Sequence, residues 1–395
     1  MDKLAVDGGN PVRATLLPYG RQSIDEDDIK AVTEALRSGW LTTGLKVGEF
    51  EREFASAVGA ADAVSMCNGT AALHAAMAAL QIGAGDEVIV PVLTFAASAN
   101  CVLFQGGKPV FVDVDPVTLL IDPAQVEASI TSRTKAMVAV DYTGLTCDYD
   151  RLKQIAKKFG IALVVDACHS LGGTYKDRPV GSLGDLNIFS FHPVKHITTG
   201  EGGMVSTDNA NYSLRLRSFR SHGITSDYRQ RESTGSWFYE MTALGYNYRL
   251  TDIQCALGLS QLKKLPLWIA RRREIASQYL NAFAAVSELT LPNVPQDRGH
   301  AWHLFVIRLN LQRLRANRGE VFRALRAENI GVNVHYIPVT WHPYYEQLGY
   351  RKGQWPVAEA AYETLLSLPM WPGMEDEDVQ DTIAAVKKVM AAYRI

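Results

Sequence analysis

The middle of the chain alternates short apolar runs with amphipathic stretches. Helical periodicity is clear at Thr70–Leu80 and Tyr149–Phe159. The run Ile161–Val165 is apolar without alternation, as is typical of a parallel strand covered on both faces. The pattern therefore predicts an α/β fold with a large, mostly parallel sheet. The predicted strands are Ala63–Met66, Glu87–Val90, Pro109–Val112, Ala136–Val140, Ala162–Val165, Asn187–Phe191 and Gly203–Thr207.

The pattern changes toward the C-terminus. Helices are predicted over Thr251–Leu265 and Trp268–Phe283, and Pro266 is expected to end or kink the first of them. A loop at Pro292–Gly299 follows. We then expect a strand, a helix, a strand and a C-terminal helix, at Trp302–Leu309, Gly319–Ala327, Gly331–His335 and Asp376–Tyr393. This order favours a large α/β domain over residues 1–260 and a smaller C-terminal α+β domain over residues 261–395.

Composition and charge narrow the class of protein. The chain has 395 residues, 47% of them hydrophobic and 21% charged, as is usual for a globular protein. A net charge of -2 gives no electrostatic reason to expect nucleic acid or a membrane surface as partner. The apolar runs are too short to span a membrane, and the N-terminus has no apolar signal core. The 5 cysteines form no C-x-x-C pair, which argues against disulfides and a zinc site. We expect a cytoplasmic enzyme without a metal.

Asp166 stands directly after the apolar run that ends at Val165. Ligands collect at the carboxyl ends of parallel strands, and a carboxylate there could hold a protonated ring nitrogen. Aspartate is also a favoured helix N-cap, so this position alone leaves both interpretations open. His169, a little further on, could be a metal ligand or a ring contact. A lone histidine is more often an ordinary hydrogen-bonded residue.

Two further segments have the composition of ligand-binding loops. Asn68-Gly-Thr70 stands between a strand and a helix, where glycine permits close approach and the first N–H groups of the helix favour a phosphate. An ordinary capped helix is the alternative. Lys195 lies between two buried strands and is followed by several glycines. A desolvated lysine with a lowered pKa would be nucleophilic, whereas a surface lysine is the plain alternative.

The order of these segments is more specific than any one of them. A phosphate loop, an acid, and a lysine 29 residues after that acid (195 minus 166) are the parts of a pyridoxal phosphate site. This cofactor needs an anion cradle, a carboxylate that keeps its ring nitrogen protonated, and a lysine that holds its aldehyde. The sequence therefore predicts that pyridoxal 5'-phosphate is the cofactor.

The same segments give the chain a family resemblance. It resembles the DegT/DnrJ/EryC1/StrS family of sugar aminotransferases, which have the aspartate aminotransferase-like fold of type I pyridoxal phosphate enzymes. The strings that carry the resemblance are Ser38–Gly44, Asn68–Thr70, Thr94–Ser98, Asp166–His169, Ser190–Lys195 and Gly245–Asp252.

The resemblance assigns roles to particular residues. It implies that Lys195 is the Schiff-base lysine, that Asp166 pairs with the ring nitrogen, and that His169 lies near the ring. It further implies that Phe95 stacks on the ring and that Gly69, Thr70 and Ser190 bind the phosphate. Asn247 would contact the phosphate of the neighbouring subunit's cofactor. The implied substrate contacts are Thr43, Arg249 and His335. From local sequence alone, Phe95 could equally be a core aromatic and Arg249 a surface ion pair. The Asn247 assignment implies a homodimer with shared active sites.

The activity implied is transamination of a nucleotide-linked keto sugar with L-glutamate as amino donor. Strings such as Phe219–Gly223 and Val334–Pro338 resemble the subgroup that aminates UDP-linked 4-keto-6-deoxy-N-acetyl-L-altrosamine in pseudaminic acid biosynthesis. The polar insertion Thr225–Trp237 and His196 depart from that subgroup. Perosamine-type or 4-amino-arabinose-type enzymes therefore stay as alternatives. Rivals from other classes are a non-catalytic regulatory protein on this fold, which would need a DNA- or partner-binding extension, and a pyridoxal phosphate lyase.

Overall fold

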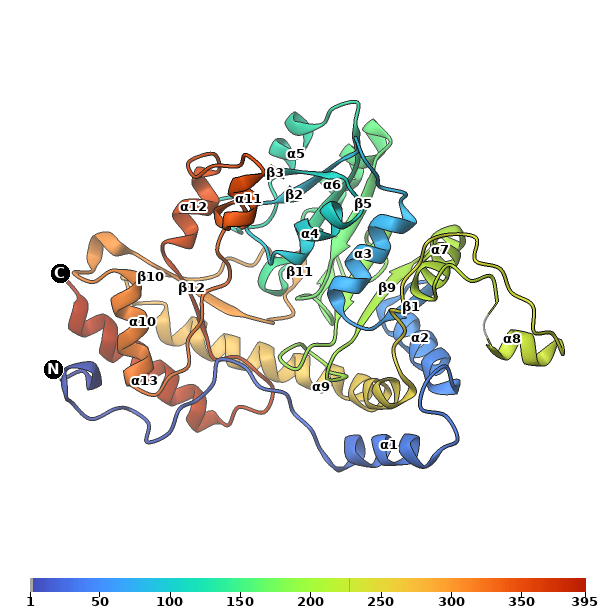
Figure 1. Ribbon diagram of the computed structural model, residues 1–395. Coiled ribbons are helices and arrows are strands. Elements are labelled where there is room, and N and C mark those ends of the chain that lie inside the picture. Colours follow the sequence, from blue (N-terminus) through green and yellow to red (C-terminus); the bar gives the residue numbers. More distant parts are fainter. Residues whose placement is uncertain (1–2, 227) are drawn as a thin grey trace.

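The computed structural model describes residues 3–226 and 228–395, and a 7-stranded sheet forms the centre of its larger part (Figure 1). The strand order is β1-β9-β8-β5-β4-β2-β3. Neighbours from β8 to β3 run parallel, whereas β9 is antiparallel to β1 and β8. The strands are β1 (Asp62–Met66), β2 (Glu87–Pro91), β3 (Lys108–Val112), β4 (Thr134–Val140), β5 (Ala162–Asp166), β8 (Leu186–Ser190) and β9 (Gly203–Thr207). The prediction of a mostly parallel α/β sheet is confirmed.

Helices cover the sheet, and their ends follow from local sequence. The Asn68 side chain accepts a hydrogen bond from the Ala71 N–H at 2.8 Å and so starts α3. Asp148 caps the start of α6, and Gly160, with a φ of 66°, ends it. The helices of this part are α1 (Glu26–Arg37), α2 (Leu45–Val58), α3 (Gly69–Ala79), α4 (Ala97–Phe104), α5 (Pro123–Ser129), α6 (Tyr149–Phe159), α7 (Ala210–Arg220) and α8 (Tyr228–Ser233).

A second, smaller hydrophobic cluster lies toward the C-terminus. A 3-stranded sheet of order β10-β12-β13 packs there with α10 and α13, and Leu4 and Leu17 from the N-terminal segment join the same cluster. The elements of this cluster are β10 (Leu289–Thr290), β12 (Phe305–Leu309), α10 (Arg318–Ala327), β13 (Leu365–Leu368) and α13 (Asp376–Tyr393). Two short helices, α11 (Pro343–Gln347) and α12 (Pro356–Tyr362), pack instead against the larger cluster, through buried residues such as Tyr345 and Ala358. Another small sheet joins β6 (Thr174–Tyr175), β7 (Arg178–Pro179) and β11 (Arg298–Gly299). A domain boundary near residue 260 stays a proposal.

One long helix, α9 (Asp252–Phe283), connects the two clusters, so the prediction that Pro266 separates two helices is wrong. Proline removes only one N–H from the helical ladder, and side chains on either side of it hold the helix in place. Leu265 and Ile269 are buried. Lys264 pairs with Asp28 of α1 at 2.9 Å. Tertiary contacts therefore offset the lost hydrogen bond.

Two predictions about strands need correction. Residues 331–335 form no strand, because their hydrogen bonds are divided between different partners. The Gly331 N–H donates to the Leu17 carbonyl at 2.7 Å, whereas Asn333 exchanges hydrogen bonds with Ser367. The place beside β12 is taken by β13, which the sequence did not reveal. The strand expected from Trp302 begins only at Phe305, since Trp302 has a φ of 50°, outside the strand region.

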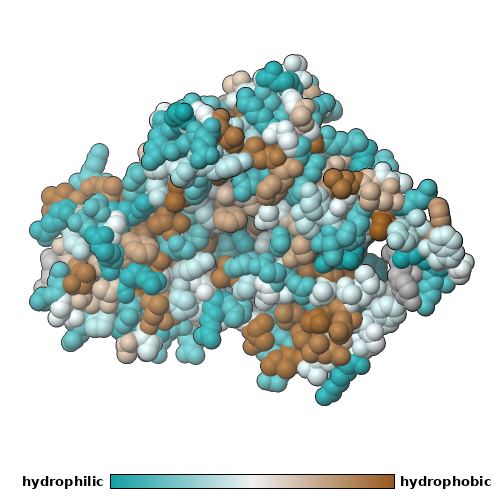
Figure 2. All heavy atoms as spheres, viewed as in Figure 1, coloured by the Kyte–Doolittle hydropathy of each residue, from teal (hydrophilic) through white to brown (hydrophobic). Residues whose placement is uncertain are grey.

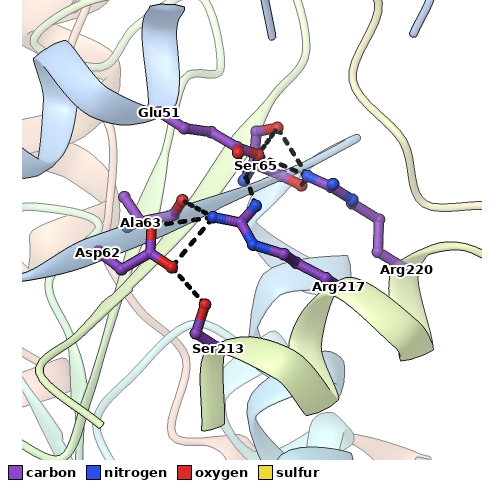
Figure 3. A network of polar contacts seen from close by, with 7 residues as sticks. All are labelled: Glu51, Asp62, Ala63, Ser65, Ser213, Arg217 and Arg220. Atoms are coloured by element: carbon purple, nitrogen blue, oxygen red, sulfur yellow. Dashed lines mark hydrogen bonds and ion pairs between the residues drawn. The ribbon is translucent and has the colours of Figure 1, made fainter. Parts of the chain in front are cut away.

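A buried ionic network fixes the helices next to β1 (Figure 3). The Glu51 carboxylate of α2 accepts hydrogen bonds from Arg217 at 2.7 Å and from Arg220 at 2.5 Å, and both arginines belong to α7. Burial alone would raise the pKa of Glu51, but the two guanidinium groups outweigh it and the pKa lies below its ordinary value. Arg217 also contacts Asp62 at the start of β1. The network thereby ties α2 and α7 to the strand that leads into the Asn68–Thr70 loop.

Candidate active site

A cavity of about 950 Å³ opens beside the carboxyl ends of β5 and β8. Its walls come from the larger part of the chain and from the segments around His303 and His335. The described residues that line it include eight of the predicted site residues, namely Gly69, Thr70, Phe95, Asp166, His169, Ser190, Lys195 and His335. The fold thus collects at one place residues that the sequence separates widely.

The start of α3 forms an anion cradle at one end of this cavity. Gly69 stands in the first turn, where a Cβ atom would come within 2.9 Å of the Ser190 Cβ. Only glycine therefore lets this helix terminus approach the end of β8. The first N–H groups of a helix carry partial positive charge, and the hydroxyl groups of Thr70 and Ser190 stand on the same cavity wall. This arrangement fits a phosphate group.

Asp166 is the last residue of β5 and projects into the cavity. Its carboxylate accepts hydrogen bonds from the Ser98 hydroxyl at 2.6 Å and from the Cys168 N–H at 3.2 Å. The Thr94 and Ser98 hydroxyls lie 2.8 Å apart. These contacts orient the carboxylate before any ligand arrives, which suits it to pair with a protonated ring nitrogen.

Lys195 lies on the loop between β8 and β9, is partly exposed, and lines the cavity. Its N–H donates to the His192 carbonyl at 2.9 Å, which closes a tight turn. Its Nζ lies 3.4 Å from His303 Nε2. Surrounding protein lowers the pKa of the Lys195 ammonium by burial, against the opposing effect of Asp166 and Cys168. The neutral, nucleophilic amine is therefore favoured relative to a surface lysine.

Histidine and tyrosine side chains also line the cavity. His169 Nε2 lies 3.1 Å from the Tyr336 hydroxyl, and burial keeps the pKa of His169 well below its ordinary value. Phe95 is exposed to the cavity, with its ring centroid 5.7 Å from that of Tyr336. Burial also lowers the pKa of His335 to about 4. The cavity therefore contains neutral imidazoles and aromatic surface suited to a flat ring.

Three predicted residues lie outside the cavity lining of their own chain. Asn247 is exposed and pairs with Ser221 through an isolated bridge. Thr43 and Arg249 are partly exposed on segments that meet beside the start of α9, where Thr42 bridges to Thr251. Their proposed roles thus depend on a ligand that extends out of the cavity, or on a second subunit.

Several residues of the site were not predicted from the sequence, and three of them contact predicted residues in ways that bear on the chemistry. Ser98 belongs to the Thr94–Ser98 string, which could have revealed it as a partner of Asp166. Tyr336 belongs to the string around His335, but nothing local connects it to His169. His303 stands in an apolar stretch and carries no local sign of its contact with Lys195.

The fold and these residues together define a pyridoxal phosphate enzyme. The cradle at Gly69 fits the phosphate, Asp166 fits the ring nitrogen, and Lys195 fits the aldehyde. Within the described part of the chain, no group of three or more His, Cys, Asp or Glu side chains is arranged to hold a metal ion. No described helix is both long and apolar enough to cross a membrane.

Comparison with known proteins agrees with this class. The family model for the DegT/DnrJ/EryC1/StrS aminotransferase family matches residues 22–387. The spore coat polysaccharide biosynthesis protein SpsC of Bacillus subtilis is 44% identical over 381 residues, which cover 96% of this chain and 98% of SpsC. The chain belongs to the DegT/DnrJ/EryC1/StrS aminotransferase family.

Solved structures show the same similarity. The PMP-form of Spr1654 from Streptococcus pneumoniae, assigned as a sugar aminotransferase, superimposes with a TM-score of 0.90 at 34% identity, over 95% of this chain and 99% of that one. PseC from Helicobacter pylori, an aminotransferase involved in the biosynthesis of pseudaminic acid, superimposes with a TM-score of 0.89 at 30% identity, over 96% and 100%. The chain is a pyridoxal phosphate-dependent sugar aminotransferase.

Proposed function

We propose that this enzyme transfers the amino group of L-glutamate to C4 of a nucleotide-linked 4-keto-6-deoxy sugar, with the UDP-linked 4-keto derivative of 6-deoxy-N-acetyl-L-altrosamine as substrate. The observation that carries the reaction type is the convergence of Gly69, Asp166 and Lys195 on one cavity. The likeness to PseC supports the choice of sugar. Perosamine-type and 4-amino-arabinose-type substrates are the competing candidates within the same reaction.

Each of these residues has a separate task. When bound, pyridoxal phosphate supplies an aldehyde carbon that exchanges amino groups and a ring that takes up negative charge. Asp166 holds the proton on the ring nitrogen, and its contact with Ser98 keeps the carboxylate in position. Lys195 would hold the aldehyde carbon and, once freed from it as a neutral amine, would carry a proton from the donor carbon to that carbon. In the second half-reaction it would carry a proton from that carbon to the sugar carbon. Two half-reactions that share one lysine predict ping-pong kinetics.

A second copy of the chain completes the site in this proposal. Asn247 is exposed and stands outside its own cavity, yet the Cys67 N–H of the phosphate loop donates to the Tyr248 carbonyl at 2.8 Å. The loop that carries Asn247 is therefore attached to the rim of the site. Two stretches of sequence that adjoin Thr43 and Asn247 expose large apolar side chains. These are Ile24, Ile29, Leu36, Trp40, Leu41 and Leu45 in the first stretch, and Trp237, Phe238, Met241 and Leu244 in the second.

The exposed apolar side chains form a patch on the surface of the molecule. Figure 2 shows hydrophobic residues gathered over α1 and the start of α9, next to the segment that carries Thr43. Monomeric proteins rarely expose large contiguous apolar surface, so a homodimer contact at this face accounts for it. Arg249 and Thr43 would then meet substrate groups that project from the cavity toward the partner.

The substrate is tested by direct screening. Purified enzyme with glutamate is offered the 4-keto products of UDP-, dTDP- and GDP-sugar dehydratases, and mass spectrometry records the amino sugars formed. We expect efficient amination of the UDP-linked 4-keto-6-deoxy-N-acetyl-L-altrosamine. Turnover of only GDP- or dTDP-linked sugars would reject this substrate, whereas the proposed reaction type, transamination of a keto sugar, would stand. No amino transfer to any keto sugar would reject the proposed function.

A further inference from the structure

His303 is placed beside the reacting amine but has no task in the proposed reaction. Its Nε2 lies 3.4 Å from Lys195 Nζ, and its ring centroid lies 4.4 Å from that of His169. The side chain is buried, with 4% of its surface exposed. It belongs to the segment of residues 300–304, which precedes β12, and it lines the cavity together with Lys195.

Buried polar contacts fix this segment. Arg272 of α9 is fully buried, and its Nη1 donates to the carbonyl groups of Trp302 at 3.0 Å and His303 at 3.3 Å. His196, the residue after the reacting lysine, places its Nε2 3.1 Å from the Ala301 carbonyl. The same segment is thus held from α9 and from the loop that carries the lysine. This double attachment sets the distance between the imidazole and the amine.

The charges around the pair favour a neutral imidazole. Burial lowers the pKa of His303 well below its ordinary value, and the nearby Lys195 charge acts in the same direction. Arg272 adds a further buried cation on this side, although burial lowers its own pKa to about 9. The other titratable groups that face the pair from neighbouring elements are Asp166, Cys168, His169, His196, His335 and Tyr336. A neutral imidazole next to a lysine can accept a hydrogen bond from the ammonium form.

We propose that His303 orients the Lys195 amine and accepts a hydrogen bond from its ammonium form while the lysine carries a proton. The inference rests on the proposed role of Lys195. In the step concerned, the C–H bond of the donor carbon breaks, its proton binds the lone pair of Nζ, and the electron pair stays with the cofactor-linked donor. The ammonium then donates an N–H to Nε2, and the proton of the imidazole itself stands on Nδ1, a buried atom with no hydrogen-bond partner among the described residues. His303 gains no proton, so the pair carries a single positive charge until the lysine gives up its extra proton.

The test compares two substitutions of His303. His303→Leu removes the acceptor, and His303→Gln places an amide oxygen where it can accept in place of Nε2. The first readout is the single-turnover rate of amino transfer from glutamate, together with the KM for glutamate. The second uses full-length protein stripped of cofactor. It follows labelling of Lys195 by fluorodinitrobenzene against pH, with peptide mass spectrometry.

The leucine variant should transfer the amino group about tenfold to a hundredfold more slowly, the size of a lost charge-assisted hydrogen bond. Its KM should stay within about threefold, because His303 touches the lysine rather than the donor. Half-maximal labelling should move to lower pH. Loss of the acceptor destabilises the ammonium form of Lys195 more than the neutral amine, and so lowers the pKa of the lysine. The glutamine variant should recover most of the rate and the wild-type labelling curve.

Three outcomes would overturn the inference: a leucine variant within about twofold of the wild-type rate, a rise in KM with an unchanged rate constant, or an unchanged labelling curve. Should the leucine variant fail to fold, His303→Asn replaces it, because its shorter amide cannot reach Nζ. The inference then requires loss in the asparagine variant and not in the glutamine variant. Failure of the proposed function is recognised separately, since borohydride reduction of the wild-type enzyme would then leave the cofactor on a residue other than Lys195.

Discussion

At the scale of single residues, the role that we propose for Asp166, at the end of β5, is to hold the proton on the ring nitrogen of the cofactor. Asp166→Asn should still bind pyridoxal phosphate but lose activity by at least about tenfold to a hundredfold, because an amide cannot hold the proton on the ring nitrogen. Steady-state kinetics and the visible spectrum of the bound cofactor measure the two effects.

A matched control for this substitution follows β3, the edge strand of the same sheet. Asp113 also follows a buried strand and is itself buried, but its carboxylate accepts hydrogen bonds from the Val357 and Ala358 N–H groups at 2.9 Å and so caps α12. Asp113→Asn should keep activity within about twofold of wild type. Equal activity of the Asp166→Asn variant would instead show that Asp166 serves only as a structural cap.

The sequence predicted eight of the residues that line the cavity, and its omissions have a physical cause. Asp166 stands at the end of β5 and Lys195 on the loop that follows β8, where the alternation of strands and helices already predicts a ligand site. His303 reaches Lys195 across 108 positions of sequence, through a segment whose Trp302 adopts a positive φ. Contacts of this kind arise from tertiary packing, and neither periodicity nor spacing contains them.

At the scale of elements, the buried carboxylate of α2 tests how the phosphate loop is supported. Glu51→Gln should cost about 3 kcal/mol of stability, because Arg217 and Arg220 lose their shared partner in a buried setting. The solvent-facing pair of Lys46 and Glu49 provides the control, and Glu49→Gln should change stability by less than about 0.5 kcal/mol. Thermal unfolding of both variants measures the difference.

The effect of Glu51 has a defined dependence on pH. Its pKa in the folded protein lies below the ordinary value of 4.5, so its ionised form contributes stability above about that pH. The contribution is lost as the pH falls through the lowered pKa. The gap in stability between wild type and Glu51→Gln should therefore be full at neutral pH and shrink in acid. A gap that does not depend on pH would show that packing, and not charge, is responsible.

Element boundaries show where sequence reasoning stops. The C-terminal helix over Asp376–Tyr393 was predicted to the residue, since its apolar spacing and acidic first turn are both local signals. The continuity of α9 through Pro266 was not, because ion pairs with α1 and buried side chains override a local helix breaker. Residues 331–335 failed as a strand for the same kind of reason, since strand pairing depends on what lies alongside.

At the scale of the whole molecule, the shared-site proposal predicts complementation between inactive subunits. The Lys195→Ala and Asn247→Ala proteins are mixed under conditions that exchange subunits. The cofactor concentration is kept too low to saturate the Asn247→Ala protein, whose cofactor binding should be weaker by about 1–3 kcal/mol. In the mixed dimer, one site carries both lesions and the other carries neither. Activity should return to as much as half the wild-type level per mixed dimer.

Two controls define the outcome of the mixing experiment. Exchange must be shown independently, for example by mass spectrometry of dimers with one labelled subunit. If Asn247→Ala alone is fully active at low cofactor, or if exchange occurs and no activity returns, the sites are not shared. Self-association of this kind could be inferred from the sequence only through family resemblance, because exposure of Asn247 is a property of the fold.

The central claim is that Lys195 is the residue that holds the cofactor, and one measurement tests it most directly. Wild-type enzyme is reduced with borohydride and digested, and the pyridoxyl group is located by peptide mass spectrometry. We predict that the group lies on Lys195. Lys195→Ala should show no such attachment and no turnover while it unfolds like wild type, whereas Lys46→Ala should behave as wild type in both respects. A pyridoxyl group on any other lysine, or its persistence in the Lys195→Ala variant, would contradict the account.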